Sequence, residues 1–159
     1  MLNRRFLVLA TAVAALAGCA TSSAPVSVTD TIAAQSQLST LNGLVTKAGL
    51  SDTLKSGGPY TVFAPTNEAF AKVPAKTMDA LAHDPAKLKA VLAYHVVPGK
   101  VMAADVKNGN AKTVNGANVA LSKAGEFVTV EEALVQTADI SATNGVVHIV
   151  DAVLIPPTK

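Results

Sequence analysis

The chain has 159 residues, of which 50% are hydrophobic and 15% charged, which is enough apolar material for one domain with a packed core. Removing Arg4 and Arg5, which lie in an N-terminal segment that we expect to be cleaved, leaves 11 of the 13 basic residues, equal to the 11 acidic ones. All the remaining cations are lysines, and a neutral chain without arginine argues against a nucleic-acid-binding function. Cys19 is the single cysteine, so the domain has no internal disulfide.

The first 18 residues are predicted to be a lipoprotein signal peptide. Arg4 and Arg5 precede the apolar stretch 6–16, which is shorter than the roughly 20 residues that a helix needs to cross a bilayer. Leu16-Ala17-Gly18-Cys19 follows directly and resembles a bacterial lipobox. The paired arginines also fit a twin-arginine export signal, but the residues after them fit it poorly, so ordinary secretion is favoured.

Resemblance to bacterial lipoproteins implies that Cys19 becomes the first residue of the mature chain and carries acyl chains, such as palmitate. Several acyl chains give stable membrane attachment. Ala20 follows this cysteine, where an aspartate would indicate retention in the inner membrane, so an outer-membrane anchor facing the periplasm or the cell surface is expected. Small residues then predict that the lipidated cysteine and a flexible tether occupy residues 19–27, and that the folded domain occupies residues 28–159.

The first half of the domain carries mainly helical patterns. One apolar stripe consists of Leu38, Leu41, Val45 and Ala48. A strand begins at Tyr60 and ends at Pro65, and Thr66 can cap a helix over residues 67–72. A further helix begins with Asp84 as cap and Pro85 in the first turn, and its stripe consists of Leu88, Val91, Leu92 and His95.

The second half, beyond Lys107, is rich in β-branched residues. Short strands are predicted over residues 112–114, 119–121, 127–130, 134–137 and 146–150. Asn115-Gly116 and Asn144-Gly145 are hairpin signals between them. The pattern predicts a single α+β domain, with a helical first half packed on a strand-rich second half.

Three segments resemble the fasciclin (FAS1) domain family. Residues 60–70 read YTVFAPTNEAF and resemble its first signature, and residues 145–156 read GVVHIVDAVLIP and resemble its second. Between them, residues 92–98 read LAYHVVP and match its Tyr-His segment at Tyr94 and His95. The resemblance implies the FAS1 fold and a role in adhesion or extracellular interaction.

The histidines are the main candidates for chemistry. For His95 we favour a buried, hydrogen-bonded imidazole at a helix-to-strand junction, with direct partner contact by Tyr94 and His95 as the alternative. His83 is expected to stabilise a helix C-terminus, and His148 to pack in the last strand. Metal binding by His95 together with His148 stays open, but two histidines make a weak site.

Catalytic motifs are missing from the sequence: it contains no Gly-x-Ser-x-Gly elbow, no phosphate-binding loop and no His-x-x-x-His. Glu131 and Glu132 are expected at an edge or turn as solubilising residues, with a divalent-cation site as the weaker interpretation. We therefore expect a non-enzyme without cofactor.

The favoured function is a membrane-anchored, extracytoplasmic module that mediates cell adhesion or contact with an envelope or matrix component. Its partner is an unidentified protein or glycan. The first alternative is a carrier or sensor of an apolar small molecule bound between helices and sheet. A hydrolase is the least favoured class, because no nucleophile motif is present.

Overall fold

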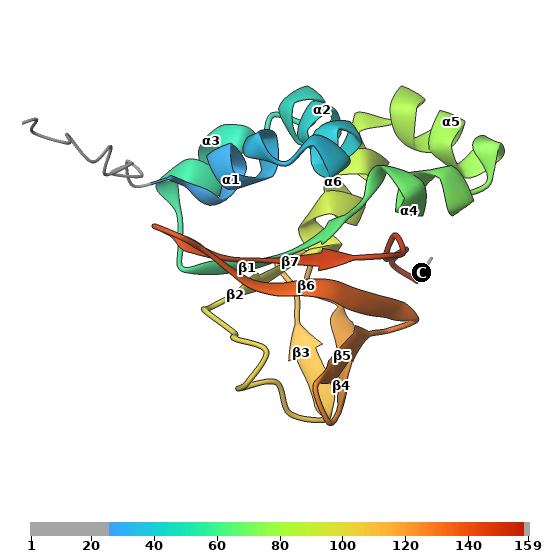
Figure 1. Ribbon diagram of the computed structural model, residues 1–159. Helices are drawn as coiled ribbons and strands as arrows, with labels where there is room; N and C mark the ends of the chain where they lie inside the picture. Colours follow the sequence, from blue (N-terminus) through green and yellow to red (C-terminus); the bar gives the residue numbers. More distant parts are fainter. Residues whose placement is uncertain (1–25, 158–159) are drawn as a thin grey trace, which may run out of the picture.

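The computed structural model describes residues 26–157, which form an α+β fold (Figure 1). The helical segments are α1 (Val28–Ala34), the 3₁₀ turn η1 (Ser36–Leu38), α2 (Ser39–Lys47), α3 (Ser51–Ser56), α4 (Asn67–Lys72), α5 (Ala75–His83) and α6 (Pro85–Tyr94). The strands are β1 (Tyr60–Pro65), β2 (Val96–Pro98), β3 (Gly109–Lys112), β4 (Asn118–Ala124), β5 (Phe127–Val130), β6 (Ala133–Ala142) and β7 (Gly145–Val150).

The strands form one seven-stranded sheet in the order β2-β1-β7-β6-β5-β4-β3. Helices cover one face of β1, β7 and β6, whereas β3, β4 and β5 lie on the other side of these strands (Figure 1). The seven-stranded sheet bends at β6. The first residues of this strand pair with β5, and its later residues pair with β7. Its pairing with β7 shifts register twice, between Val135 and Thr137 and between Thr137 and Ile140. Such bulges bend a strand and let one sheet enclose two cores.

Two apolar cores lie on opposite faces of β1 and β7. Val62 and Ala64 of β1 face the helices, where they join Val147 and Ile149 of β7. Phe63 faces the other way and packs with the side chains of β4 and β5. β1 and β7 are parallel neighbours and all six residues of β7 are buried, as expected for a strand covered on both faces.

The helix predictions are confirmed where local signals were strong. The Thr66 hydroxyl accepts a hydrogen bond from Ala69 N and caps α4. The Asp84 carboxylate accepts hydrogen bonds from Ala86 N and Lys87 N, and Pro85 opens α6. Within residues 26–157, no helix is long and apolar enough to cross a membrane.

The strand predictions need two corrections. The strand expected at residues 112–114 lies earlier, at Gly109–Lys112, because Val114 N and Asn115 N instead donate to Val96 O and Ala93 O. β6 continues to Ala142, beyond the expected end at 137, because this continuation pairs with the buried strand β7. β1 is the strand predicted from Tyr60 to Pro65, and it is a central strand of the sheet. β2 follows His95, at the helix-to-strand junction expected there.

Gly145 has a role different from the one expected of an Asn-Gly hairpin. The β6–β7 hairpin is present, but Ala142 pairs with Gly145, so the loop consists of Thr143 and Asn144. A Cβ atom on Gly145 would lie 1.9 Å from Tyr60 O in the neighbouring strand. This glycine therefore permits the close approach of β1 to β7.

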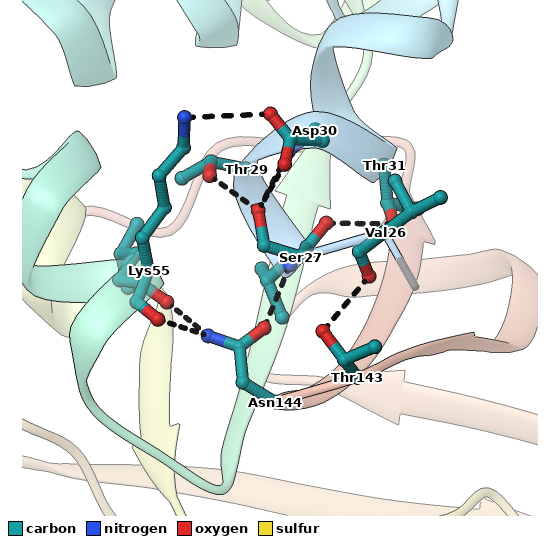
Figure 2. Close-up of polar contacts among 10 residues, drawn as sticks. Val26, Ser27, Thr29, Asp30, Thr31, Lys55, Thr143 and Asn144 are labelled. Carbon is teal, nitrogen blue, oxygen red and sulfur yellow. Dashed lines mark hydrogen bonds and ion pairs between the residues drawn. The ribbon is translucent and has the colours of Figure 1, made fainter. Parts of the chain in front are cut away.

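Asn144 links the hairpin to the start of the domain and to the end of α3 (Figure 2). Its Oδ1 accepts a hydrogen bond from Val28 N at 2.9 Å, and its Nδ2 donates to Leu54 O and, at 3.3 Å, to Gly57 O. Its carbonyl oxygen accepts from Tyr60 N at 3.0 Å. The side chain thus satisfies backbone groups from two segments that are distant in sequence, and the backbone carbonyl satisfies a third.

Val26 and Ser27 precede the predicted boundary at residue 28 but are held to the domain. Thr143 donates to Val26 O through its amide at 2.9 Å and through its hydroxyl at 3.2 Å, and Figure 2 shows the hydroxyl contact. The Ser27 hydroxyl accepts from Asp30 N as the cap of α1. Val26 and Ser27, which we assigned to the tether over residues 19–27, therefore belong to the domain. Cys19 and the signal peptide lie outside the described residues.

We predict that Asn144→Ala destabilises the domain by about 2–4 kcal/mol, because several buried backbone groups lose their partner at once. Asn144→Asp should also destabilise it, since a carboxylate cannot donate to Leu54 O and Gly57 O. The control is Thr143→Val, which removes one exposed hydrogen bond to Val26 O. Urea unfolding of the three variants measures the difference. A wild-type midpoint for Asn144→Ala would contradict the assigned role.

Candidate functional site

Tyr94 and His95 lie at the C-terminal end of α6, directly before β2. Tyr94 is the last residue of the helix and His95 is its C-cap. Leu88, Val91 and Leu92 of the same helix pack into the core, and this fixes the helix against the sheet. Each of the two side chains is 2% exposed. The Tyr-His segment is therefore part of the interior.

The Tyr94 hydroxyl connects α6 to the β5–β6 turn. It lies 3.0 Å from Asn118 O and 3.1 Å from Glu131 Oε1, both of which accept from it. Glu131 Oε1 also accepts from Ala120 N at 3.0 Å. Burial, followed by the hydrogen bond to Glu131, raises the pKa of Tyr94 to about 12. The phenol therefore remains protonated and serves as a donor at neutral pH.

Glu131 does more than the solubilising turn residue that we expected. It lies between β5 and β6 with φ of 57°, in the left-handed region that non-glycine residues seldom adopt. Its side chain is exposed, yet its carboxylate accepts hydrogen bonds from two other elements. Sequence reasoning missed this role because the partners, Tyr94 and Ala120, are distant in sequence.

His95 joins α6 to the segment after β7. Its Nδ1 lies 2.8 Å from Val91 O, and Leu154 N donates to its Nε2 at 3.0 Å. Because Nε2 accepts, the proton is on Nδ1 and the ring is neutral. Burial lowers the pKa of His95 to about 4. The structure thus places His95 as the buried, hydrogen-bonded imidazole of our favoured interpretation, with almost no surface for direct partner contact.

His148 fixes the connection between β2 and β3 from the opposite face of β7. Its Nδ1 accepts from Asp139 N at 3.1 Å, so Nε2 carries the proton and donates to Val101 O at 2.8 Å. Its ring stacks on Phe63 with centroids 5.6 Å apart. Burial lowers the pKa of His148, against the opposing influence of the Val101 carbonyl and the Asp139 carboxylate. This is the packing role expected of it.

His83 is the third histidine that the sequence singled out. The His83 ring contacts Asp79 O at 2.8 Å in the last turn of α5, the helix end at which it was expected. Among residues 26–157, no group of three or more histidine, cysteine or acidic side chains is placed to hold a metal ion.

A groove of about 280 Å³ lies beside the Tyr94 and His95 contacts. It is lined by residues 131–133, which begin at the β5–β6 turn, and by residues 152–155, which follow β7. Glu131 is hydrogen-bonded to Tyr94, and Leu154 is hydrogen-bonded to His95. A second groove, of about 310 Å³, is lined by the polar residues Gln37, Thr66, Asn67, Glu68 and Gln136. Both grooves open at the surface.

A fasciclin domain model matches residues 36–156, and the chain belongs to this family. It is 40% identical over 146 residues to protein sll1483 of Synechocystis, covering 91% of this chain and 81% of that protein. It is 39% identical over 110 residues to the cell surface glycolipoprotein MPB83 of Mycobacterium bovis, covering 69% of this chain and 49% of MPB83.

Among solved structures, the fold is similar to the FAS1 domain pair of the insect cell adhesion molecule fasciclin I. The TM-score is 0.62 at 25% identity, and the match covers 77% of this chain and 46% of that one. The chain is thus a bacterial-type fasciclin domain protein with the FAS1 fold. The family is one of extracellular and cell-adhesion proteins.

We predict that acid destabilises the domain through His95. The folded-state pKa lies below the ordinary value, so the unfolded chain binds the proton first as the pH falls. Stability contributed by the neutral ring is complete above pH 6.5 and is lost towards pH 4, by roughly 3 kcal/mol in total. Thermal unfolding between pH 7 and 4 measures this loss.

Two variants distinguish the effect of His95 protonation on stability from other effects of acid. His95→Gln should be less stable than wild type at pH 7, but its stability should decline less towards pH 4. His83→Gln, which removes an exposed imidazole, should keep the wild-type decline. Equal pH dependence in His95→Gln and wild type would exclude His95 as the source.

Proposed function

We propose that this chain is a lipid-anchored, extracytoplasmic interaction module without enzymatic activity, which mediates adhesion or contact with an envelope or matrix component. The observation that carries the proposal is its membership of the fasciclin family. Two of the similar proteins are, by their names, a cell surface glycolipoprotein and a cell adhesion molecule. The lipobox that ends at Cys19 supports anchoring in the outer membrane, on its periplasmic or surface face.

The position of Val26 at one end of the sheet fits a tethered domain. Val26 is held at the β6–β7 hairpin by Thr143, and the Glu131 turn lies at the other end of β6. A domain attached through residues before 26 would therefore keep the groove away from its attachment point. This arrangement favours contact with a partner beyond the membrane surface.

The carrier alternative receives less support. An apolar ligand between the helices and the sheet would need space in a layer that buried side chains occupy, among them Leu41, Leu88 and Ile149. The two grooves described above lie at the surface and have polar residues on their rims. We therefore favour the interaction module.

Lipid anchoring predicts a specific outcome for Cys19→Ser. Cells of the host fed an alkyne analogue of palmitate should label the wild-type chain, and the variant should lose the label and leave the membrane fraction. Ser22→Ala, a neighbouring change that spares the cysteine, should label like wild type. Full labelling of Cys19→Ser would rule out the anchor.

The adhesive role is tested separately in the same host. A strain without this protein should attach less to neighbouring cells or to their matrix, and re-expression of the wild-type chain should restore attachment. Unchanged attachment of the deletion strain would refute the interaction function, whatever the labelling result.

A further inference from the structure

The groove between residues 131–133 and residues 152–155 combines an acidic rim with an apolar wall. Glu131 and Glu132 are exposed at the β5–β6 turn, and neither forms an ion pair within residues 26–157. Ile155, which also lines the groove, is 53% exposed although it is a large aliphatic side chain. Leu134, next to the groove, is 37% exposed. The surface therefore joins uncompensated negative charge to exposed apolar area.

Two adjacent residues at the C-terminal end of α6, Tyr94 and His95, form hydrogen bonds to residues that line the groove. Tyr94 donates to the Glu131 carboxylate, and His95 accepts from the Leu154 amide. Asp151 supports the same region, because its carboxylate accepts from Leu134 N at 2.8 Å. The Glu131 carboxylate and the Leu154 backbone are thus each held by a hydrogen bond to the end of α6, and the bond to Leu154 is buried.

The other charges near the groove are few. Asp151 adds a third carboxylate, and Lys72 reaches only the Asp151 carbonyl, at 3.2 Å. The net charge of the side chains near the groove is therefore negative, although the mature chain is formally neutral. Ionised carboxylates only accept hydrogen bonds, so the complementary group is a cation that donates them. The apolar wall requires an aliphatic neighbour beside that cation.

We propose that this groove binds a protein segment in which a lysine or arginine stands beside an aliphatic residue, with the cation between Glu131 and Glu132 and the aliphatic side chain against Ile155. The volume of about 280 Å³ suits one or two side chains, not a folded domain. Tyr94 and His95 are positioning residues, because their burial removes them from direct contact. This inference rests on the proposed interaction function and names the chemistry of the partner.

The test uses the full chain purified from host membranes in detergent, and three blocked peptides as probes. The first is Leu-Lys-Leu, the second is Leu-Glu-Leu and the third is Ser-Lys-Ser. Amide chemical shifts in ¹⁵N spectra report binding. Leu-Lys-Leu should perturb residues 131–134 and 152–155 and weaken with added salt, whereas the other two should bind at least several-fold more weakly. Equal binding of all three peptides, or shifts located elsewhere, would overturn the inference.

Matched variants measure how much individual residues contribute to Leu-Lys-Leu binding. Glu131→Gln with Glu132→Gln should weaken Leu-Lys-Leu binding about fivefold, as expected for two exposed ion pairs. Glu126→Gln removes an exposed acid at the β4–β5 turn and should bind like wild type. Tyr94→Phe should weaken binding without removing any surface charge. Wild-type affinity in the double glutamine variant would contradict the proposed rim.

Two further outcomes separate this inference from the proposed function and from self-association. If the double glutamine variant restores attachment of the deletion strain as fully as wild type, the groove is not the partner site and the interaction function stands. If sedimentation shows a dimer that Ile155→Ser dissociates, the groove's occupant is a second copy and the inference is wrong.

Discussion

The parallel pairing of β1 with β7 is the constraint on which the rest of the structure depends. The pairing runs from Tyr60 opposite Gly145 to Pro65 opposite Val150, and it brings together the two segments that resemble the family signatures. Alternate residues of these strands supply the helical core on one face and the core shared with β4 and β5 on the other. β2 lies beside β1 and β6 lies beside β7, so this pair forms the centre of the helix-covered part of the sheet.

Much of the fold could be predicted from the sequence where the signal was local. The Thr66 cap, the Asp84-Pro85 start of α6 and the strand over residues 127–130 each depend on a few neighbouring residues, and the structure has all three. The continuation of β6 to Ala142 depends on its partner β7, because residues 138–142 read ADISA and contain a single β-branched residue. The role of Gly145 depends on a carbonyl of β1, which no pattern within the hairpin reveals.

In the candidate site too, the features set by neighbouring residues could be predicted and those set by tertiary contacts could not. Tyr94 and His95 could be singled out from the sequence, and the burial of His95 follows from its place on an apolar helical stripe. Their action on the groove could not be predicted, because it depends on Glu131 and Leu154, which reach the helix end through tertiary contacts. A segment can thus matter for binding without being exposed, because it is hydrogen-bonded to two surface segments.

The entry of the chain at Val26 has a mechanical consequence. Val26 is bound to the β6–β7 hairpin, whereas the groove residues 131–133 and 152–155 lie where β6 begins and β7 has ended. A pulling force on the chain before Val26 acts first on the two hydrogen bonds from Thr143 to Val26 O, and then on α1, because the chain continues from Val26 into α1 and not into the sheet. The β1–β7 and β6–β7 ladders lie outside this covalent path. Tension on the preceding chain would therefore detach Val26 before it disturbs the pairing of β1 with β7.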